Sequence, residues 1–395
     1  MYVNIEFLDT EPMENVITAL HYKMDKTIFI GFHDTITAYK KQTISFLRGN
    51  CEVKEVEFVE VPSNDLCAIE AAIRKQVVNE QNAGNKVFFD ITGGEGLILV
   101  AFGMLSKEYT LPMHQFDVIG DKIKELNVNE ATPLSQYRDV QRNEKVAMNL
   151  DKYVSMWGGE IKRSPEDNKD KLPIHSEDFL KKIPAIWNVL QAYKEEWNKF
   201  TSCMSGTLKT IDLEVDTIVE VDAIYKWDDF QKFLKKLSDA EAISKPFIDA
   251  VKKEKKTDPE RVRIKFRYDS WDIKRVFLKS GNVFELKVYL DRKNEVGTLD
   301  CDMGVKIDWD GNAANGGVFN EIDVMSLKGN IVTFVSCKGG DMEGNAALNP
   351  MYQMDTIASR FGGKYARKML ATRERISDVH LERAESMNIE WKWYR

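Results

Sequence analysis

The chain has 395 residues, of which 43% are hydrophobic and 30% charged, a size and composition that predict a globular protein of two domains with a linker or insertion. No stretch reaches the roughly 18 to 20 uncharged apolar residues of a membrane-spanning helix, and the first residues lack a basic signal-peptide region, so we expect a cytoplasmic protein with no membrane segment. The net charge of -7 disfavours nucleic acid as a partner of the whole chain, and five scattered cysteines without a CxxC pair argue against a disulfide framework or structural zinc.

Residues 1 to about 130 alternate short apolar runs with amphipathic stretches, which is the pattern of βαβ units around a parallel sheet. Helices are expected to begin near Met13, Thr35, Asn64 and Gly96. We assign residues 1–135 to a doubly wound, Rossmann-like α/β domain. The apolar runs predict strands at Val3–Leu8, Thr27–Phe32, Glu55–Glu60, Lys86–Ile91, Met113–Phe116 and Lys124–Asn127.

The middle of the chain changes composition twice. The pair Gly158-Gly159 and the polar stretch 164–170 predict a linker. Residues 176–256 are mostly amphipathic, with aromatic residues near helical spacing of the kind that face a core. We expect residues 136–265 to form a linker and a helical connector that packs on the C-terminal domain or at a dimer contact.

Residues 266–395 predict a second α/β domain. The expected elements are a helix at Asn282–Tyr289, strands at Cys301–Trp309, Glu321–Leu327 and Ile331–Cys337, and a helix from about Tyr352. Between residues 251 and 295 there are fourteen Lys or Arg against eight Asp or Glu, and the last 36 residues are also net basic. This half is compatible with a polyanionic substrate, although a solvated charged face would give the same composition.

A glycine turn in the first domain predicts a ligand site. The strand ending at Ile91 runs into Thr92-Gly93-Gly94-Glu95, and an apolar helix follows. Such a turn places backbone N–H groups at the carboxyl edge of a sheet, where phosphates bind. The Thr92 hydroxyl could donate to a phosphate or ribose, whereas Glu95 opposes an anion. A purely structural tight turn is the alternative interpretation.

The loop after the first strand brings further polar groups to the same edge, among them Asp9, Thr10 and Asn15. The DxTGG pattern from Asp90 to Gly94, together with the opening from Ile5 to Ile30, resembles CARF domains, the Rossmann-fold sensors of CRISPR-associated proteins that bind cyclic oligoadenylates. This resemblance implies that Asp9, Thr10, Asn15, Thr92, Gly93, Gly94 and Glu95 bind such a ligand. Relatives often carry a basic residue where this chain has Glu95.

Three residues of the second domain have the spacing of a PD-(D/E)xK nuclease site. Glu285 lies on the predicted helix, Asp323 on a predicted strand, and Lys338 at the end of the next strand. Phosphodiester hydrolysis at such a site needs carboxylates that hold one or two divalent cations and a lysine that orients the attacking water. Ordinary charges on a hairpin are the alternative interpretation of this spacing.

Ser336 departs from this pattern, because an acidic residue usually occupies its position. A serine hydroxyl can bind a cation but does not neutralise it. Glu321 lies on the same strand face as Asp323 and is our first candidate to supply the missing charge. Glu343 is a second candidate. We therefore expect Glu285, Asp323 and Glu321 to bind the metal, with Ser336 and Lys338 beside them.

Four segments around these residues resemble the CARF-fused PD-(D/E)xK effector nucleases of type III CRISPR systems: 277–281, 320–324, 336–338 and 355–366. The resemblance spans residues 1–130 and about 270–375. It implies a restriction-endonuclease-like C-terminal domain and a homodimer that binds cyclic tetra-adenylate. It also implies allosteric activation of Mn²⁺- or Mg²⁺-dependent cleavage of DNA, RNA or both, in antiviral defence.

Two other functions were compared with this one. A non-catalytic regulator, responsive to a cyclic nucleotide and binding nucleic acid without cutting it, is compatible with Ser336. A nucleotide-dependent oxidoreductase is disfavoured, because no GxGxxG fingerprint follows the first strand. After Asp355, four basic residues fall at helix-like spacing and predict either a solvated face or a ridge that tracks phosphates: Arg360, Lys364, Arg367 and Lys368.

Overall fold

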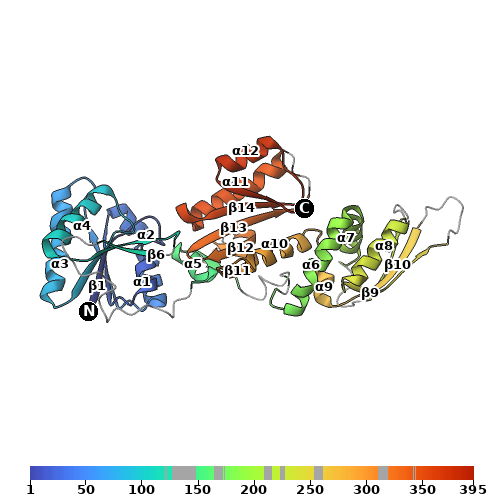
Figure 1. Ribbon diagram of the computed structural model, residues 1–395, viewed down its shortest axis with the longest axis horizontal. Coiled ribbons are helices and arrows are strands. Elements are labelled where there is room, and N and C mark those ends of the chain that lie inside the picture. Colours follow the sequence, from blue (N-terminus) through green and yellow to red (C-terminus); the bar gives the residue numbers. More distant parts are fainter. Residues whose placement is uncertain are drawn as a thin grey trace.

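The computed structural model describes residues 1–120, 122–126, 148–163, 172, 174–208, 216–222, 227–252, 261–309, 319–340, 342 and 344–395. Three sheets follow one another along an elongated molecule (Figure 1). The N-terminal sheet lies at one end, the C-terminal sheet in the middle, and the three-stranded sheet of residues 216–268 at the other end. The middle part of the chain therefore does not separate the two expected domains in space.

The first sheet has the strand order β3-β2-β1-β4-β5-β6, in which only β6 is antiparallel to its neighbour. β1 and β2 are buried almost throughout, as expected for central strands covered on both faces. The predicted Rossmann-like domain is confirmed. Its elements are β1 (Tyr2–Phe7), α1 (Ile17–His21), β2 (Lys26–Gly31), α2 (His33–Asn50), β3 (Glu55–Glu60), α3 (Leu66–Asn82), β4 (Lys86–Asp90), α4 (Gly96–Tyr109), β5 (Met113–Asp117) and β6 (Lys122–Leu126).

The strand order reverses between β1 and β4. In open α/β sheets ligands bind at such a point, outside the carboxyl ends of the strands. The loop after β1 and the glycine turn after β4 both lie at this position. One local prediction was displaced: the helix expected near Met13 begins at Ile17, because the chain first forms turns through residues 10–16.

The C-terminal sheet has the order β15-β14-β13-β12-β11-β7, antiparallel from β7 to β13 and parallel from β13 to β15. The helix expected from Tyr352 begins earlier and runs through Pro350, because Ala347 and Met351 are fully buried and their packing outweighs the local cost of the proline. The elements are α9 (Trp271–Val276), α10 (Asn282–Lys293), β11 (Thr298–Asp308), β12 (Phe319–Lys328), β13 (Ile331–Lys338), α11 (Asn345–Phe361), η3 (Gly363–Tyr365), β14 (Arg367–Thr372), α12 (Asp378–Ser386) and β15 (Ile389–Trp393).

Residues 150–161, expected in the linker, belong to this second sheet. They form α5 (Leu150–Met156) and the short strand β7 (Glu160–Ile161), which pairs with β11 at Ile307 and Asp308. The polar stretch 164–170 and the expected boundary at residue 135 lie outside the described residues. The domain limits at residues 135 and 265 remain predictions.

The connector was predicted to be helical, but it also contains a sheet. It contains α6 (Glu177–Ala192), α7 (Lys194–Leu208) and α8 (Trp227–Asp239), and also an antiparallel sheet of β8 (Asp216–Asp222), β10 (Arg261–Tyr268) and β9 (Ile243–Ala250). β10 alternates buried apolar residues with outward-facing basic ones, a period of two that identifies a strand. The alternation was hidden by the many lysines and arginines around it.

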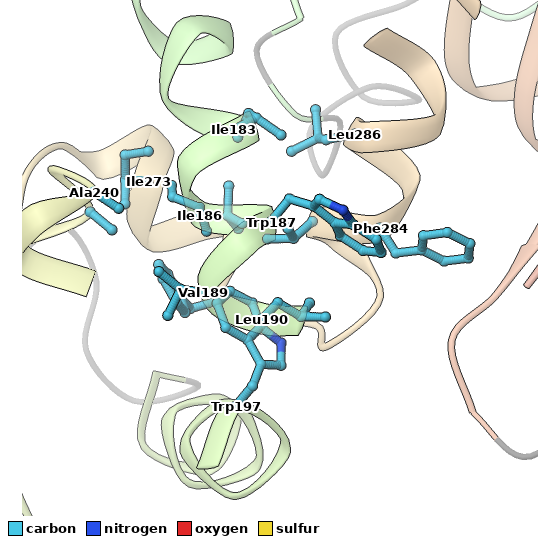
Figure 2. Packing of buried hydrophobic residues seen from close by; sticks show 14 of the residues in the cluster. Ile183, Ile186, Trp187, Val189, Leu190, Trp197, Ala240, Ile273, Phe284 and Leu286 are labelled. Atoms are coloured by element: carbon cyan, nitrogen blue, oxygen red, sulfur yellow. The ribbon is translucent and has the colours of Figure 1, made fainter. Parts of the chain in front are cut away.

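The connector packs on the C-terminal domain, as expected. Figure 2 shows Ile183 and Trp187 of α6 on the side that meets α10, while Leu190 lies toward Trp197 of α7. The rings of Trp187 and Phe284 of α10 stack with centroids 5.6 Å apart. Among the described residues no helix is long and apolar enough to cross a membrane. Cys51, Cys67, Cys301 and Cys337 are free thiols.

Candidate functional site

The two polar loops of the first domain meet, as the sequence predicted. Asp9 follows β1, and its Oδ2 accepts a hydrogen bond at 3.3 Å from the backbone N–H of Gly94. The Asp9 Oδ1 accepts from the backbone N–H of Glu11 at 3.1 Å. A Cβ atom at Gly93 would lie 3.1 Å from the Cβ of Asp9, so this turn needs glycine for close packing. Asp9, Gly93 and Gly94 therefore form one compact surface at the sheet edge.

Asn15 supports this surface from inside. Its Oδ1 accepts from the backbone N–H of Asp9 at 2.7 Å, and its Nδ2 donates to the carbonyl oxygen of Asp9 at 2.8 Å. Asn15 is 1% exposed. The side chain therefore positions the loop of Asp9, and the ligand contact predicted for it would need a rearrangement of that loop.

Thr92 is also occupied by the fold. Its hydroxyl donates to Asp90 Oδ1 at 2.5 Å and accepts from the backbone N–H of Phe116 at 2.8 Å. Burial alone would raise the pKa of Asp90, but His114 and hydrogen bonds from Thr18 and Thr92 hold it below its usual value. The single donor of the Thr92 hydroxyl is thus committed to a buried carboxylate, so Thr92 shapes the glycine turn.

The accessible groups of the predicted ligand site are different ones. Gly94 has a φ of +136°, a conformation that favours glycine. Glu95 is exposed at the N-cap of α4 and makes no capping hydrogen bond. Thr10 is exposed on the opposite loop. Thr10 and Glu95 are therefore the exposed side chains of this site, on a frame fixed by Asn15 and Thr92.

In the second domain the hairpin of β12 and β13 brings three predicted site residues together. Asp323 Oδ2 accepts hydrogen bonds from the Ser336 hydroxyl at 3.1 Å and the Cys337 backbone N–H at 2.6 Å. The Lys338 ammonium lies 3.6 Å from the same oxygen. Ser336 thus orients the Asp323 carboxylate. The residues next to Ser336 in the sequence do not reveal this orienting role, because it arises from the pairing of β12 with β13.

These residues line a hollow of about 290 Å³ between the hairpin and α11. Glu321 lies on its wall, in β12. Gln353 and Met354 close it from α11. The middle of α11, from Pro350 to Ile357, therefore forms part of the predicted active site.

Glu285 lines a neighbouring hollow of about 650 Å³, together with Lys279, Gly339, Gly340 and Arg373. Burial, and then the negative charges of Asp323 and Glu321, raise the pKa of Glu285 to about 7, against the opposing effect of Lys279 and Lys338. The three carboxylates predicted to bind metal are therefore close enough to repel one another. Glu343 lies outside the described residues.

The donor set fits a hard divalent cation, although the side chains are not gathered into a ligand cage. Among the described residues no group of three His, Cys, Asp or Glu is arranged to hold a metal ion. Carboxylate oxygens are the ligands that Mg²⁺ and Mn²⁺ prefer. A cation would relieve the mutual repulsion that raises the pKa of Glu285. Glu285 and Asp323 are the residues that would hold it, with Glu321 as a third donor.

A contact between the two domains was missed by the sequence analysis. Glu11 Oε1 accepts from the backbone N–H of Lys364 at 2.9 Å. Glu14 Oε1 lies 2.8 Å from the Lys364 ammonium and accepts a hydrogen bond from the Tyr365 hydroxyl. Burial raises the pKa of both carboxyl groups, even though Lys364 opposes the rise. Two acidic residues of the ligand-site loop are thus inserted into the second domain.

The same contact corrects the expected basic ridge. α11 ends at Phe361, and Gly363, with a φ of +52°, begins the short helix η3. Arg367 and Lys368 lie on β14. The four basic residues therefore do not share one helix face. The pair of glycines at 362 and 363 was the sequence signal for this break.

The comparisons with known proteins agree with this architecture. Residues 272–391 match the family model described as the Card1-like endonuclease domain. Protein VC1899 from Vibrio cholerae has a similar fold, with a TM-score of 0.70 and 18% identity over 99% of this chain and 93% of that one. Among curated proteins no sequence matches this chain.

Two further solved structures share the fold. Can2 from Sulfobacillus thermosulfidooxidans, in complex with cyclic tetra-adenylate, aligns with a TM-score of 0.64 and 13% identity over 99% of this chain and 93% of that one. A type III CRISPR defence DNA nuclease activated by cyclic oligoadenylate aligns with a TM-score of 0.51 and 12% identity, over 94% of this chain and 45% of that one. This chain therefore shares the fold of these structures over nearly its whole length. Within it, residues 272–391 are similar to the Card1-like endonuclease domain.

Proposed function

We propose that this protein is a nuclease activated by a cyclic oligoadenylate, with cyclic tetra-adenylate as the first candidate. It cleaves DNA, RNA or both with Mn²⁺ or Mg²⁺, in the cytoplasm, as an effector of type III CRISPR antiviral defence. The Card1-like endonuclease domain supports the cleavage part of this proposal. The similarity to Can2, which was solved with cyclic tetra-adenylate, supports the sensor part.

The observation that carries the proposal is the direct link between the two sites. Glu14 is 3% exposed and lies between them. A Cβ atom at Gly93 would lie 3.1 Å from Glu14 Oε2, while Glu14 Oε1 contacts Lys364 and Tyr365. Lys364 and Tyr365 follow α11, whose middle part lines the hollow at Asp323. A ligand that moves the glycine turn would therefore press on the helix that closes the nuclease site.

The chemistry at the second site follows from the placement of the side chains. Glu285, Asp323 and Glu321 would hold a divalent cation, which would polarise the phosphate and favour deprotonation of the attacking water. The Ser336 hydroxyl keeps Asp323 Oδ2 directed toward β13. Lys338 places an ammonium group in the same hollow, where it orients the water and contacts the phosphate.

A homodimer is part of the proposal. An apolar stripe runs along α4, directly after the glycine turn, where Leu97, Val100 and Met104 are 36%, 48% and 51% exposed. Their spacing places them on one helix face. A second copy that covers this stripe would bring two glycine turns together around a symmetric cyclic ligand. Light scattering with and without ligand tests this: a monomer under both conditions would contradict it.

The decisive test of activation uses Tyr365→Phe, which removes only the hydroxyl that contacts Glu14. We expect ligand-stimulated cleavage to fall at least about fivefold, in the range of ordinary coupling energies, with unchanged ligand affinity and basal rate. Tyr352→Phe is the matched control, because Tyr352 lies exposed on α11 and contacts Arg383 rather than the sensor. Cleavage is measured with Mn²⁺ on single- and double-stranded DNA and RNA, with cyclic tri-, tetra- and hexa-adenylate. Equal stimulation in both variants would argue against the proposed link.

The alternative function is a regulator that binds nucleic acid without cutting it. Ser336 favours this alternative, because it stands where an acidic metal ligand is usual and donates a hydrogen bond to Asp323 instead. Ligand-dependent binding of nucleic acid without cleavage at any tested metal concentration would make this alternative the better one.

A further inference from the structure

Arg373 lies next to the predicted site lysine, directly after the end of the neighbouring strand β14. β13 and β14 are parallel, with Lys338 paired to Thr372. Arg373 follows directly, and its backbone N–H donates to the carbonyl oxygen of Lys338 at 3.2 Å. Its guanidinium group is therefore carried at the carboxyl ends of two central strands, beside the hollow that contains Glu285.

This guanidinium group is buried without compensation. Arg373 is 3% exposed, and within the described part of the chain its side chain makes no hydrogen bond or ion pair, with Nε left as a buried donor. Burial lowers the pKa of Arg373. Arg292, which is 9% exposed, shows the ordinary arrangement: it donates to Ser326 and Thr333 and pairs with Glu295. A buried cation without such partners destabilises the fold, and an anionic ligand would offset that cost.

The hollow beside Arg373 has the chemistry of a phosphate site. The turn of Gly339 and Gly340 forms one wall, and a Cβ atom at Gly339 would lie 3.6 Å from the Arg373 Nη1. Lys279 adds a second, exposed cation on the opposite wall. Among the described residues that line the hollow, Glu285 is the one carboxylate, and it would oppose an anion unless protonated or bound to a cation.

We propose that Arg373, with Lys279 and the turn of Gly339 and Gly340, binds a backbone phosphate of the nucleic-acid substrate next to the bond cleaved at Asp323 and Lys338. A guanidinium group presents paired N–H donors that match phosphate oxygens. Lys338 lines the hollow of Asp323, and the next residue, Gly339, lines this one, so one strand of nucleic acid would reach both. The inference rests on the proposed nuclease function and adds a substrate-binding residue to it.

The test is binding of a short fluorescein-labelled single-stranded DNA, and of the same sequence as RNA, by the full-length protein. Fluorescence anisotropy is recorded in EDTA, so that no cleavage occurs, over about 50 to 200 mM salt. Arg373→Gln should weaken binding about tenfold, the size of a charge-assisted hydrogen bond, and should reduce the salt slope by about 0.7 for the lost phosphate contact. Arg383→Gln, on the exposed side of α12, is the control and should change neither quantity.

A second pair of variants keeps the test valid if Arg373→Gln does not fold. A side chain at Gly340 meets no atom within 4 Å, so Gly340→Asp and Gly340→Asn both fit and differ only in charge. The aspartate should weaken binding severalfold more than the asparagine. Equal affinities of Gly340→Asp and Gly340→Asn, or an unchanged affinity and salt slope in folded Arg373→Gln, would overturn the phosphate site while the wild type still binds and cleaves. A wild type that binds neither oligonucleotide would refute the proposed function and this inference together.

Discussion

The sensor loops and the nuclease hollows differ in how their polar and charged side chains are compensated. At the sensor, Asp9, Asn15 and Thr92 direct their side chains into internal hydrogen bonds. At the nuclease, Glu285 is buried close to like charges, and Arg373 is buried with no side-chain partner among the described residues. The polar side chains of the sensor surface therefore already have hydrogen-bond partners within the fold. The nuclease surface holds buried charges that a bound cation and a phosphate would balance.

This difference indicates which property of each site would select its ligand: the geometry of the turn at the sensor and the placement of charge at the nuclease. A cyclic ligand recognised by backbone groups needs a turn of fixed geometry, and the buried Asp90 network supplies that rigidity. Hydrolysis of a phosphodiester needs uncompensated charge that is already in place before the substrate arrives. Glu14 touches both regions, so a change of shape in the first can alter the placement of charge in the second.

The largest expected effect is on the cleavage rate, and it would test the charged groups at the nuclease site. Asp323→Ala or Lys338→Ala should reduce cleavage by at least about a hundredfold, because each removes a group that acts directly on the metal or the phosphate. Dimer formation and ligand affinity should remain as in the wild type. The readout is the initial cleavage rate with Mn²⁺ and saturating activator.

Two controls sharpen that result. Ser336→Ala removes a hydrogen bond to Asp323 rather than a charge, so its loss of rate should be smaller. Asp291→Ala, which breaks an ion pair with Lys287 on α10, should have little effect. Wild-type rates in Asp323→Ala would show that the hairpin is not the catalytic centre.

The next effect concerns stability and pH. Because folding raises the pKa of Glu285 from 4.5 to about 7, the folded state binds more protons than the unfolded state in this window. The free energy of unfolding should therefore fall as the pH rises from 4.5 to about 7, by about 3 kcal/mol at about 1.4 kcal/mol per pH unit. Glu285→Gln should remove this loss, so in EDTA the variant should exceed the wild type in stability above pH 7.

Glu295 provides the opposite case on the same part of the chain. Its hydrogen bond from Lys328 lowers its pKa, so its contribution is present at neutral pH and lost in acid. Glu295→Gln should therefore lower stability at neutral pH. Urea unfolding of both variants between pH 4 and pH 8 gives the comparison, and parallel curves for Glu285→Gln and the wild type would contradict the assigned pKa.

The smallest expected effect is on ligand affinity, and it would test the geometry of the glycine turn at the sensor. Gly93→Ala places a Cβ atom 3.1 Å from both Asp9 and Glu14, so the turn must shift by a few tenths of an ångström. We expect the affinity for cyclic tetra-adenylate to fall about tenfold, as for a lost pair of neutral hydrogen bonds. Gly96→Ala is the control, because its Cβ meets no atom within 4 Å. Calorimetry that gives equal affinities for the two variants would place the ligand elsewhere.

Local pattern predicted much of the fold. The strands of the first sheet and the hairpin at Asp323 were placed within a few residues, because alternation and turn residues are local signals. The early start of α11 and the strand β10 were missed, since burial of Met351 and of Phe266 depends on distant partners. Asp323, Ser336 and Lys338 lie close together, as their spacing predicted, but the spacing did not predict the hydrogen bond between Ser336 and Asp323.

The sequence by itself determined the elements and the chemistry available at each strand end: a glycine turn after β4, carboxylates and a lysine on one hairpin. Only the tertiary structure decided how these meet. Glu14 and Tyr365 are 351 residues apart and touch because the connector folds away to the far end of the molecule (Figure 1). Arg373 is one arginine among many until packing buries it beside Lys338. Such contacts depend on which surfaces exclude water together, and that is settled by the whole chain rather than by any local segment.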